Sequence, residues 1–134
     1  MKPASEFVAG FIGSPAMNIF TIRCEDGMAV LPGGHRLPLT GLPARGDYRL
    51  GLRPEDLDVV DAGPTAIPVV LRSVEWLGAD AFGYGVIEGS DTPVTLRLSG
   101  NTAIARGDRL HVAPFAGRLH VFAPDTGKRV DVSA

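Results

Sequence analysis

The sequence predicts an all-β fold, a small barrel or sandwich built from many short strands. Its 17 glycines and 11 prolines are 28 of the 134 residues, and the longest segment free of both is residues 16–26. A helix interior disfavours glycine by about 1 kcal/mol and proline by about 3 kcal/mol. A helix longer than a couple of turns therefore has no room after the N-terminal segment. Between the glycines and prolines, apolar and polar side chains alternate with a period of two, which is typical of half-buried strands.

The N-terminal segment is the exception. Phe7, Val8, Phe11 and Ile12 fall on one face of a short helix over residues 3–13. Pro15 ends this helix because proline disfavours helical geometry at the residue before it and has no N–H to donate.

The strands are predicted from alternation and from the turn residues between them. They cover residues 18–24, 28–31, 48–53, 67–76, 82–87, 93–99, 109–112, 118–122 and 129–132. In residues 93–99, for example, Val94, Leu96 and Leu98 share one face. The tripeptides at 45–47 and 106–108 both read Arg-Gly-Asp and both precede a strand. This echo leaves open two similar β modules or a chance repeat.

Composition and charge limit the classes of function. Thirteen basic and fifteen acidic residues give a net charge of -2, with both signs spread along the chain. This pattern argues against binding to nucleic acid or to anionic membrane surfaces, which needs clustered lysine and arginine. The lone Cys24 permits no internal disulfide and fits a reducing compartment. No run of 18 apolar residues and no signal-peptide core is present, so we expect a soluble, cytoplasmic domain.

The sequence carries no motif for catalysis. It lacks a phosphate-binding loop and a nucleophile elbow, and residues 98–101 (Leu-Ser-Gly-Asn) are interpreted as a strand end. His35, His111 and His120 show no metal-ligand spacing. His111 and His120 could face each other across a hairpin near Pro114, but solvent-facing strand histidines are the favoured interpretation.

Two segments are candidates for binding. Residues 53–56 (Arg-Pro-Glu-Asp) follow an apolar strand, where proline stops the ladder and the acidic residues begin a helical turn. This is either an ion-paired strand exit between Arg53 and Glu55 or an interaction corner. Trp76 and Phe82 form either a stacking platform, with Arg72 or Arg97 nearby, or part of the core.

Four segments carry a resemblance to a known family. Residues 7–18 read Phe-Val-Ala-Gly-Phe-Ile-Gly-Ser-Pro-Ala-Met-Asn, residues 51–55 Gly-Leu-Arg-Pro-Glu, and residues 74–78 Val-Glu-Trp-Leu-Gly, while residues 119–127 hold Leu-His-Val-Phe and Asp-Thr-Gly. Together they resemble the C-terminal regulatory (TOBE) domain of the ATP-binding subunit of carbohydrate-import ABC transporters, of the maltose and glycerol-3-phosphate type. The resemblance covers nearly the whole chain.

The resemblance implies a domain organisation. It indicates OB-fold-like β-barrels, two of them if the tripeptide echo reflects duplication, after a short N-terminal helical segment. Residues 1–17 then hold the end of an ATPase-domain helix and a hinge, and residues 18–134 hold the regulatory domain. The hinge residues are Phe11, Gly13, Pro15, Met17 and Asn18. The regulatory or dimer contact surface comprises Gly51, Arg53, Pro54 and Glu55.

The function implied is that of a non-catalytic regulatory and dimerisation domain of a subunit that drives import of sugars or glycerol-3-phosphate. The expected partners are its own ATPase domain, a twin regulatory domain, the transmembrane permease subunits reached through the ATPase domain and, in some members, a phosphotransferase regulator. No cofactor is expected in this chain, because ATP and magnesium bind the ATPase domain. The expected location is cytoplasmic, peripheral at the inner face of the cell membrane.

A different class of function stays open, a free-standing β-barrel that binds a small ligand such as a sugar or an oxyanion. A small all-β enzyme is a third. The apolar half-helix at residues 7–12 favours the transporter interpretation, because a free-standing module has no need of it.

Overall fold

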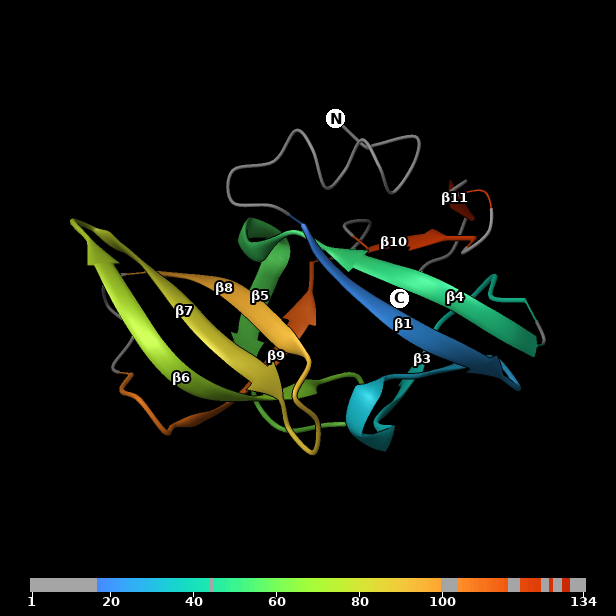
Figure 1. Cartoon of the computed structure of the whole chain (residues 1–134), viewed down its shortest axis with the longest axis horizontal. Helices are drawn as coiled ribbons and strands as arrows, with labels where there is room; N and C mark the ends of the chain where they lie inside the picture. The colour runs from blue at the N-terminus through green and yellow to red at the C-terminus, as the bar shows by residue number, and fades with distance from the viewer. Residues whose placement is uncertain are drawn as a thin grey trace.

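A computed structural model describes residues 17–43, 45–99, 104–115, 119–123, 126 and 129–130. Within these residues the chain folds into antiparallel strands joined by turns and two 3-10 helices (Figure 1). The strands are β1 (Asn18–Glu25), β2 (Met28–Val30), β3 (Arg36–Pro38), β4 (Arg45–Leu52), β5 (Leu57–Val60), β6 (Ile67–Leu77), β7 (Asp80–Ile87), β8 (Pro93–Ser99), β9 (Arg109–Pro114), β10 (Leu119–Phe122) and β11 (Arg129–Val130). The 3-10 helices are η1 (Pro32–Gly34) and η2 (Pro54–Asp56). The all-β prediction is confirmed.

The first sheet has the strand order β11-β10-β4-β1-β2-β3. Its centre is the long pair of β1 and β4, in register from Asn18 opposite Leu52 to Glu25 opposite Arg45. A tight turn joins β1 and β2, with Asp26 and Gly27 both at positive φ.

The second sheet has the order β5-β9-β6-β7-β8. Its longest pair, β6 with β7, carries a bulge where the register shifts between Leu71 and Ser73. β7 approaches β6 so closely there that a Cβ placed on Gly85 would run into the carbonyl oxygen of Val70. Glycine at this position is therefore a packing requirement.

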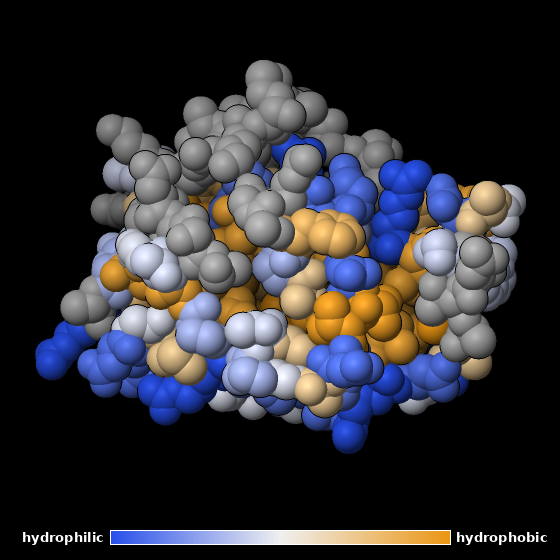
Figure 2. Space-filling model, turned by 180° about the vertical axis from the view of Figure 1, so that it is seen from behind, coloured by the Kyte–Doolittle hydropathy of each residue, from blue (hydrophilic) through white to orange (hydrophobic). Residues whose placement is uncertain are grey.

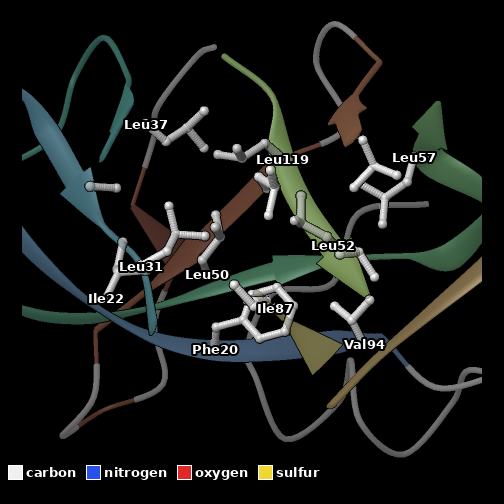
Figure 3. Close-up of a cluster of buried hydrophobic side chains, with 14 of the residues drawn as sticks. Phe20, Ile22, Leu31, Leu37, Leu50, Leu52, Leu57, Ile87, Val94 and Leu119 are labelled. Atoms are coloured by element: carbon white, nitrogen blue, oxygen red, sulfur yellow. The ribbon is translucent and has the colours of Figure 1, made fainter. Parts of the chain in front are cut away.

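One hydrophobic core joins the two sheets. Its side chains come from both sheets and gather in a single cluster (Figure 3). The labelled members are Phe20, Ile22, Leu31, Leu37, Leu50, Leu52, Leu57, Ile87, Val94 and Leu119. Some hydrophobic surface also shows through the middle of the rear face, between hydrophilic side chains (Figure 2).

The chain crosses between the sheets more than once. After β4 in the first sheet, η2 leads directly into β5 in the second, and β10 later returns to pair with β4. The two sheets are therefore interleaved along the chain. The first Arg-Gly-Asp tripeptide begins β4 of the first sheet, and the second directly precedes β9 of the second sheet. The glycine of each, Gly46 and Gly107, has a positive φ.

Most predicted strands are found within a few residues of their predicted ends. β3 and β5 were missed, and residues 131–132 of the last predicted strand lie outside the described residues. The predicted helix over residues 3–13 also lies outside them. No helix among the described residues is long and apolar enough to cross a membrane.

Candidate functional site

The end of the motif at residues 7–18 meets the start of the motif at residues 51–55 where β1 begins and β4 ends. Met17 and Phe122 are buried together in a small apolar cluster beside the main core. A Cβ on Gly51 would run into Met17 Sδ and would lie 3.0 Å from Phe122 Cε2. Gly51 is therefore the residue that lets Met17 pack across β4. The structure brings together the predicted hinge residue Met17 and the predicted contact residue Gly51.

Asn18 ties this junction to both sheets. Its side-chain Nδ2 donates to the carbonyl oxygen of Leu52 in β4 (3.0 Å) and to that of Thr95 in β8 (2.8 Å). Its Oδ1 accepts a hydrogen bond from the N–H of Thr95 (2.8 Å). The amide thus pairs with the backbone of the edge strand β8 as a neighbouring strand would. Asn18 is buried, 8% exposed, and all its bonds are to backbone.

Arg53 to Asp56 form a compact corner next to this junction. η2 is closed by a hydrogen bond from the N–H of Leu57 to the carbonyl oxygen of Pro54. Pro54 and Asp56 are buried, whereas Glu55 is exposed and Arg53 half-buried. The helical turn predicted from the acidic residues is confirmed as a 3-10 turn. The alternative of an Arg53–Glu55 ion pair is wrong, since no such pair forms in the described part of the chain.

A cleft of about 570 Å³ opens beside this corner, between β5 and β8. Glu55 lines it together with Arg97 of β8 and Asp80 of β7. Arg97 Nη2 donates to Asp80 Oδ2 at 2.9 Å, and this hydrogen bond raises the pKa of the guanidinium, with smaller contributions from the charges of Asp80 and Glu55. Glu55, a predicted contact residue, and Arg97, one of the two arginines expected near the platform, thus border one cleft.

The predicted stacking platform is not formed. Trp76 lies opposite Ala81, and Glu75 lies opposite Phe82. Opposite residues share a face and successive residues alternate, so Trp76 and Phe82 project from opposite faces of the sheet. Trp76 is 52% exposed near the β6–β7 turn, so the alternative of a core tryptophan is also wrong. Arg72 lies at the bulge and is exposed.

The histidines do not assemble a metal site. β9, with His111, belongs to the second sheet and β10, with His120, to the first, so the hairpin that would pair them does not form. His120 is buried, 3% exposed, with its ring stacked on Phe122 (centroids 6.3 Å apart), so the expectation of a solvent-facing histidine is wrong for it. Among the described residues, no three potential ligands gather for a metal ion.

Three predicted hinge residues, Phe11, Gly13 and Pro15, lie outside the described residues. Sequence reasoning missed the role of Thr95, whose backbone anchors Asn18. It also missed Asp80, the partner of Arg97. For Asn18 a signal was available, because an amide at a core-facing strand position requires hydrogen-bond partners.

Two family models match the chain. The model described as the MalK OB fold domain matches residues 13–57, and that of the TOBE domain matches residues 50–122. The chain belongs to the TOBE domain family. The boundary between the two matches falls on residues 50–57, which contain the end of β4 and the corner η2. The predicted family is confirmed.

Several curated proteins named sn-glycerol-3-phosphate import ATP-binding protein UgpC are similar to this TOBE-family chain. The one from Paracoccus denitrificans is 61% identical over 130 residues, which are 97% of this chain and 36% of that protein. Those from Ruegeria pomeroyi and Cereibacter sphaeroides are 42% and 43% identical over 129 residues, in each case 96% of this chain and 36% of the relative. The chain thus spans about a third of the length of these relatives.

A solved structure shares the fold at low sequence identity. It is the cytoplasmic molybdate-binding protein ModG with molybdate bound, 12% identical, with a TM-score of 0.65 over 92% of this chain and 100% of that chain. At this identity the likeness concerns the arrangement of strands alone.

Proposed function

We propose that this chain is the non-catalytic regulatory and dimerisation domain of the ATP-binding subunit of an ABC importer for glycerol-3-phosphate. The observation that carries the proposal is the 61% identity to the Paracoccus denitrificans import protein over 97% of the chain. The junction of Met17, Asn18 and Gly51 supports it, because the two motifs of the resemblance form one packed unit.

In this proposal the work of the chain is mechanical. Residues up to Met17 join it to an ATPase domain, which binds ATP and magnesium and reaches the permease subunits. Arg53, Pro54 and Glu55 contact a twin domain or, in some transporters, a phosphotransferase regulator. The subunit then works in the cytoplasm at the inner face of the cell membrane. The domain boundary near residue 17 is part of this proposal.

The alternative of an oxyanion-binding module is disfavoured by charge. The cleft between β5 and β8 is lined by three carboxylates, those of Glu55, Asp58 and Asp80, and by one guanidinium, that of Arg97, which gives a net charge of -2. An anion would be repelled from such a lining unless the carboxylates were protonated.

The first test of this function is to sequence the DNA upstream of the codon for Met1. An open frame that continues upstream and encodes a Gly-x4-Gly-Lys-Ser/Thr loop is the expected result. A stop codon followed by a ribosome-binding site directly before Met1 would refute the assignment.

Dimerisation is tested separately by sedimentation of the chain. We expect concentration-dependent association that Glu55→Arg weakens, while Glu75→Arg, an exposed charge reversal on β6, leaves it unchanged. Monomer alone at high micromolar concentration would refute an autonomous dimer.

A further inference from the structure

The second sheet ends on two strands that face the same cleft. β5 and β8 are its terminal strands, and residues of both line the cleft of about 570 Å³. Four antiparallel pairings separate them in the sheet, so the two edge strands run parallel to each other. The sheet therefore resembles a barrel with one seam open. A single strand lying in the seam can therefore run antiparallel to both edges at once.

The hydrogen-bond pattern shows which backbone groups face the seam. Thr95 uses its N–H and carbonyl oxygen to bond Asn18, so these groups point away from β7, and those of Arg97 point the same way. On β5, Phe115 donates its N–H to the carbonyl oxygen of Asp56 (2.9 Å). By alternation, Val59 then turns its N–H and carbonyl oxygen away from β9 and toward the seam. Within the described residues no hydrogen bond to these groups of Val59 and Arg97 is present.

The two faces of the seam differ in chemistry. Val59 lies opposite the buried Val112 on the core side, yet it is 38% exposed because no strand covers it. Asp58, the neighbour of Val59, is exposed on the other face. On that outer side the lining is acidic, and Phe115, 49% exposed, adds an aromatic surface at the rim. Side chains of an added strand would alternate between these two environments.

We propose that the seam accepts an extended segment of a partner protein, which adds as a strand between β5 and β8. Its backbone satisfies the open groups of Val59 and Arg97, as in other complexes formed by strand addition. Alternate side chains of the segment are apolar and cover Val59. The others are lysine or arginine, matched to the net charge of -2 on the cleft and to the ring of Phe115. This proposal does not depend on the transporter assignment.

The test is an NMR titration of the ¹⁵N-labelled 134-residue chain with the capped peptide Val-Arg-Val-Arg-Val. We expect saturable shifts of the amide signals of Val59 and Arg97 and slower hydrogen exchange at both. Two control peptides separate the contribution of charge from that of backbone hydrogen bonding. The peptide Val-Glu-Val-Glu-Val has the wrong charge, and a version of the first peptide with N-methylated backbone keeps the charge but cannot form a ladder. Neither should bind at the same concentrations.

Variants of the protein localise the effect. Asp58→Lys should weaken binding of the basic peptide by about fivefold, the size expected for exposed charge pairs. Asp91→Lys, a matched reversal in the β7–β8 turn, should leave it unchanged. Absence of saturable shifts at Val59 and Arg97, or equal binding of the N-methylated peptide, would overturn the proposal. So would broadening of the same two amide signals on raising the protein concentration without peptide, since a second copy would then occupy the seam.

Discussion

Replacing Asn18 by alanine removes three hydrogen bonds that hold β1, β4 and β8 together. The bonds are 2.8–3.0 Å long, and the substitution removes this side-chain partner from the backbone groups of Leu52 and Thr95. A net contribution of about 1 kcal/mol for each bond gives ~3 kcal/mol, and a buried group left unpaired adds to this. Two of the bonds are only partly buried, so water offsets some of the loss. We expect the free energy of unfolding to fall by about 2–4 kcal/mol.

Urea unfolding followed by far-UV circular dichroism measures this loss. The matched control is Thr21→Ala, because Thr21 is an exposed polar residue on the same strand. Its effect should stay within about 0.5 kcal/mol. Hydrogen exchange of the Thr95 amide supplies a local readout and should accelerate in Asn18→Ala alone. A loss below that of the control, or unchanged protection of Thr95, would refute the reasoning.

Asn18→Asp adds a pH dependence with a defined sign. The introduced carboxylate would face the carbonyl oxygens of Leu52 and Thr95, which disfavour its charged form, so its pKa in the folded state lies above its unfolded value of about 3.9. A group whose pKa is higher in the folded state makes its full contribution to the free energy of unfolding below its unfolded pKa. This contribution is lost as the pH rises through the folded pKa. The variant should therefore be closest to the parent near pH 3–4 and weakest at pH 7, relative to the parent at each pH. Equal relative stability at both values would contradict this account.

Three further predictions concern separate parts of the molecule. Gly51→Ala should destabilise the chain by about 1–3 kcal/mol through its clash with Met17, and adding Met17→Ala should cost less than the sum of the single changes, as read by thermal unfolding. Burial raises the pKa of the Cys24 thiol above its ordinary 9.0, so the thiol should react with a thiol reagent at pH 8 only after unfolding. The raised pKa also contributes to the free energy of unfolding below pH 9, and this contribution should be lost as the pH rises above 9. Asp80→Asn should leave the urea midpoint almost unchanged, because its pair with Arg97 is exposed and screened; a large shift would show that the pair contributes more than its exposure implies.

Strands with long alternation could be predicted from sequence, and short edge strands could not. Residues 93–99 alternate over their full length and form β8 with the predicted ends. β3 and β5 have only three and four residues, too few for a period to be recognised. β5 also follows η2 directly, so the predicted helical turn at residues 53–56 marks the end of β4 but not the start of a new strand. Among the described residues, β5 also pairs only with β9, which follows much later in the sequence, whereas β3 pairs with the neighbouring β2 and was missed for its shortness alone.

The candidate site was predictable in its parts more than in its assembly. The motif residues Met17, Asn18 and Gly51 could be picked out, but their contacts depend on the register of β1 with β4. Asn18 reaches Thr95, which is 77 residues away in sequence. The sequence left Trp76 and Phe82 as either a stacking platform or part of the core, whereas the observed pairing places the two on opposite faces and leaves Trp76 exposed. Register decides such contacts, since a shift of one residue reverses every side chain.

The position of Asn18 has a mechanical consequence for any motion that enters through the N-terminal junction. A hinge attached only to β1 would move the first sheet and let the second follow through core packing. Because Asn18 also holds the backbone of β8, the same residue is bonded to the edge of the second sheet. Rotation at the junction is therefore applied to both sheets at once, and the domain should turn as one body. The Asn18 side chain bonds the backbone of Thr95. The backbone groups of Arg97, two residues further along β8, face the seam between β5 and β8. In the proposed function and the proposed strand addition, motion at the junction and occupation of the seam would therefore act on the same strand, β8.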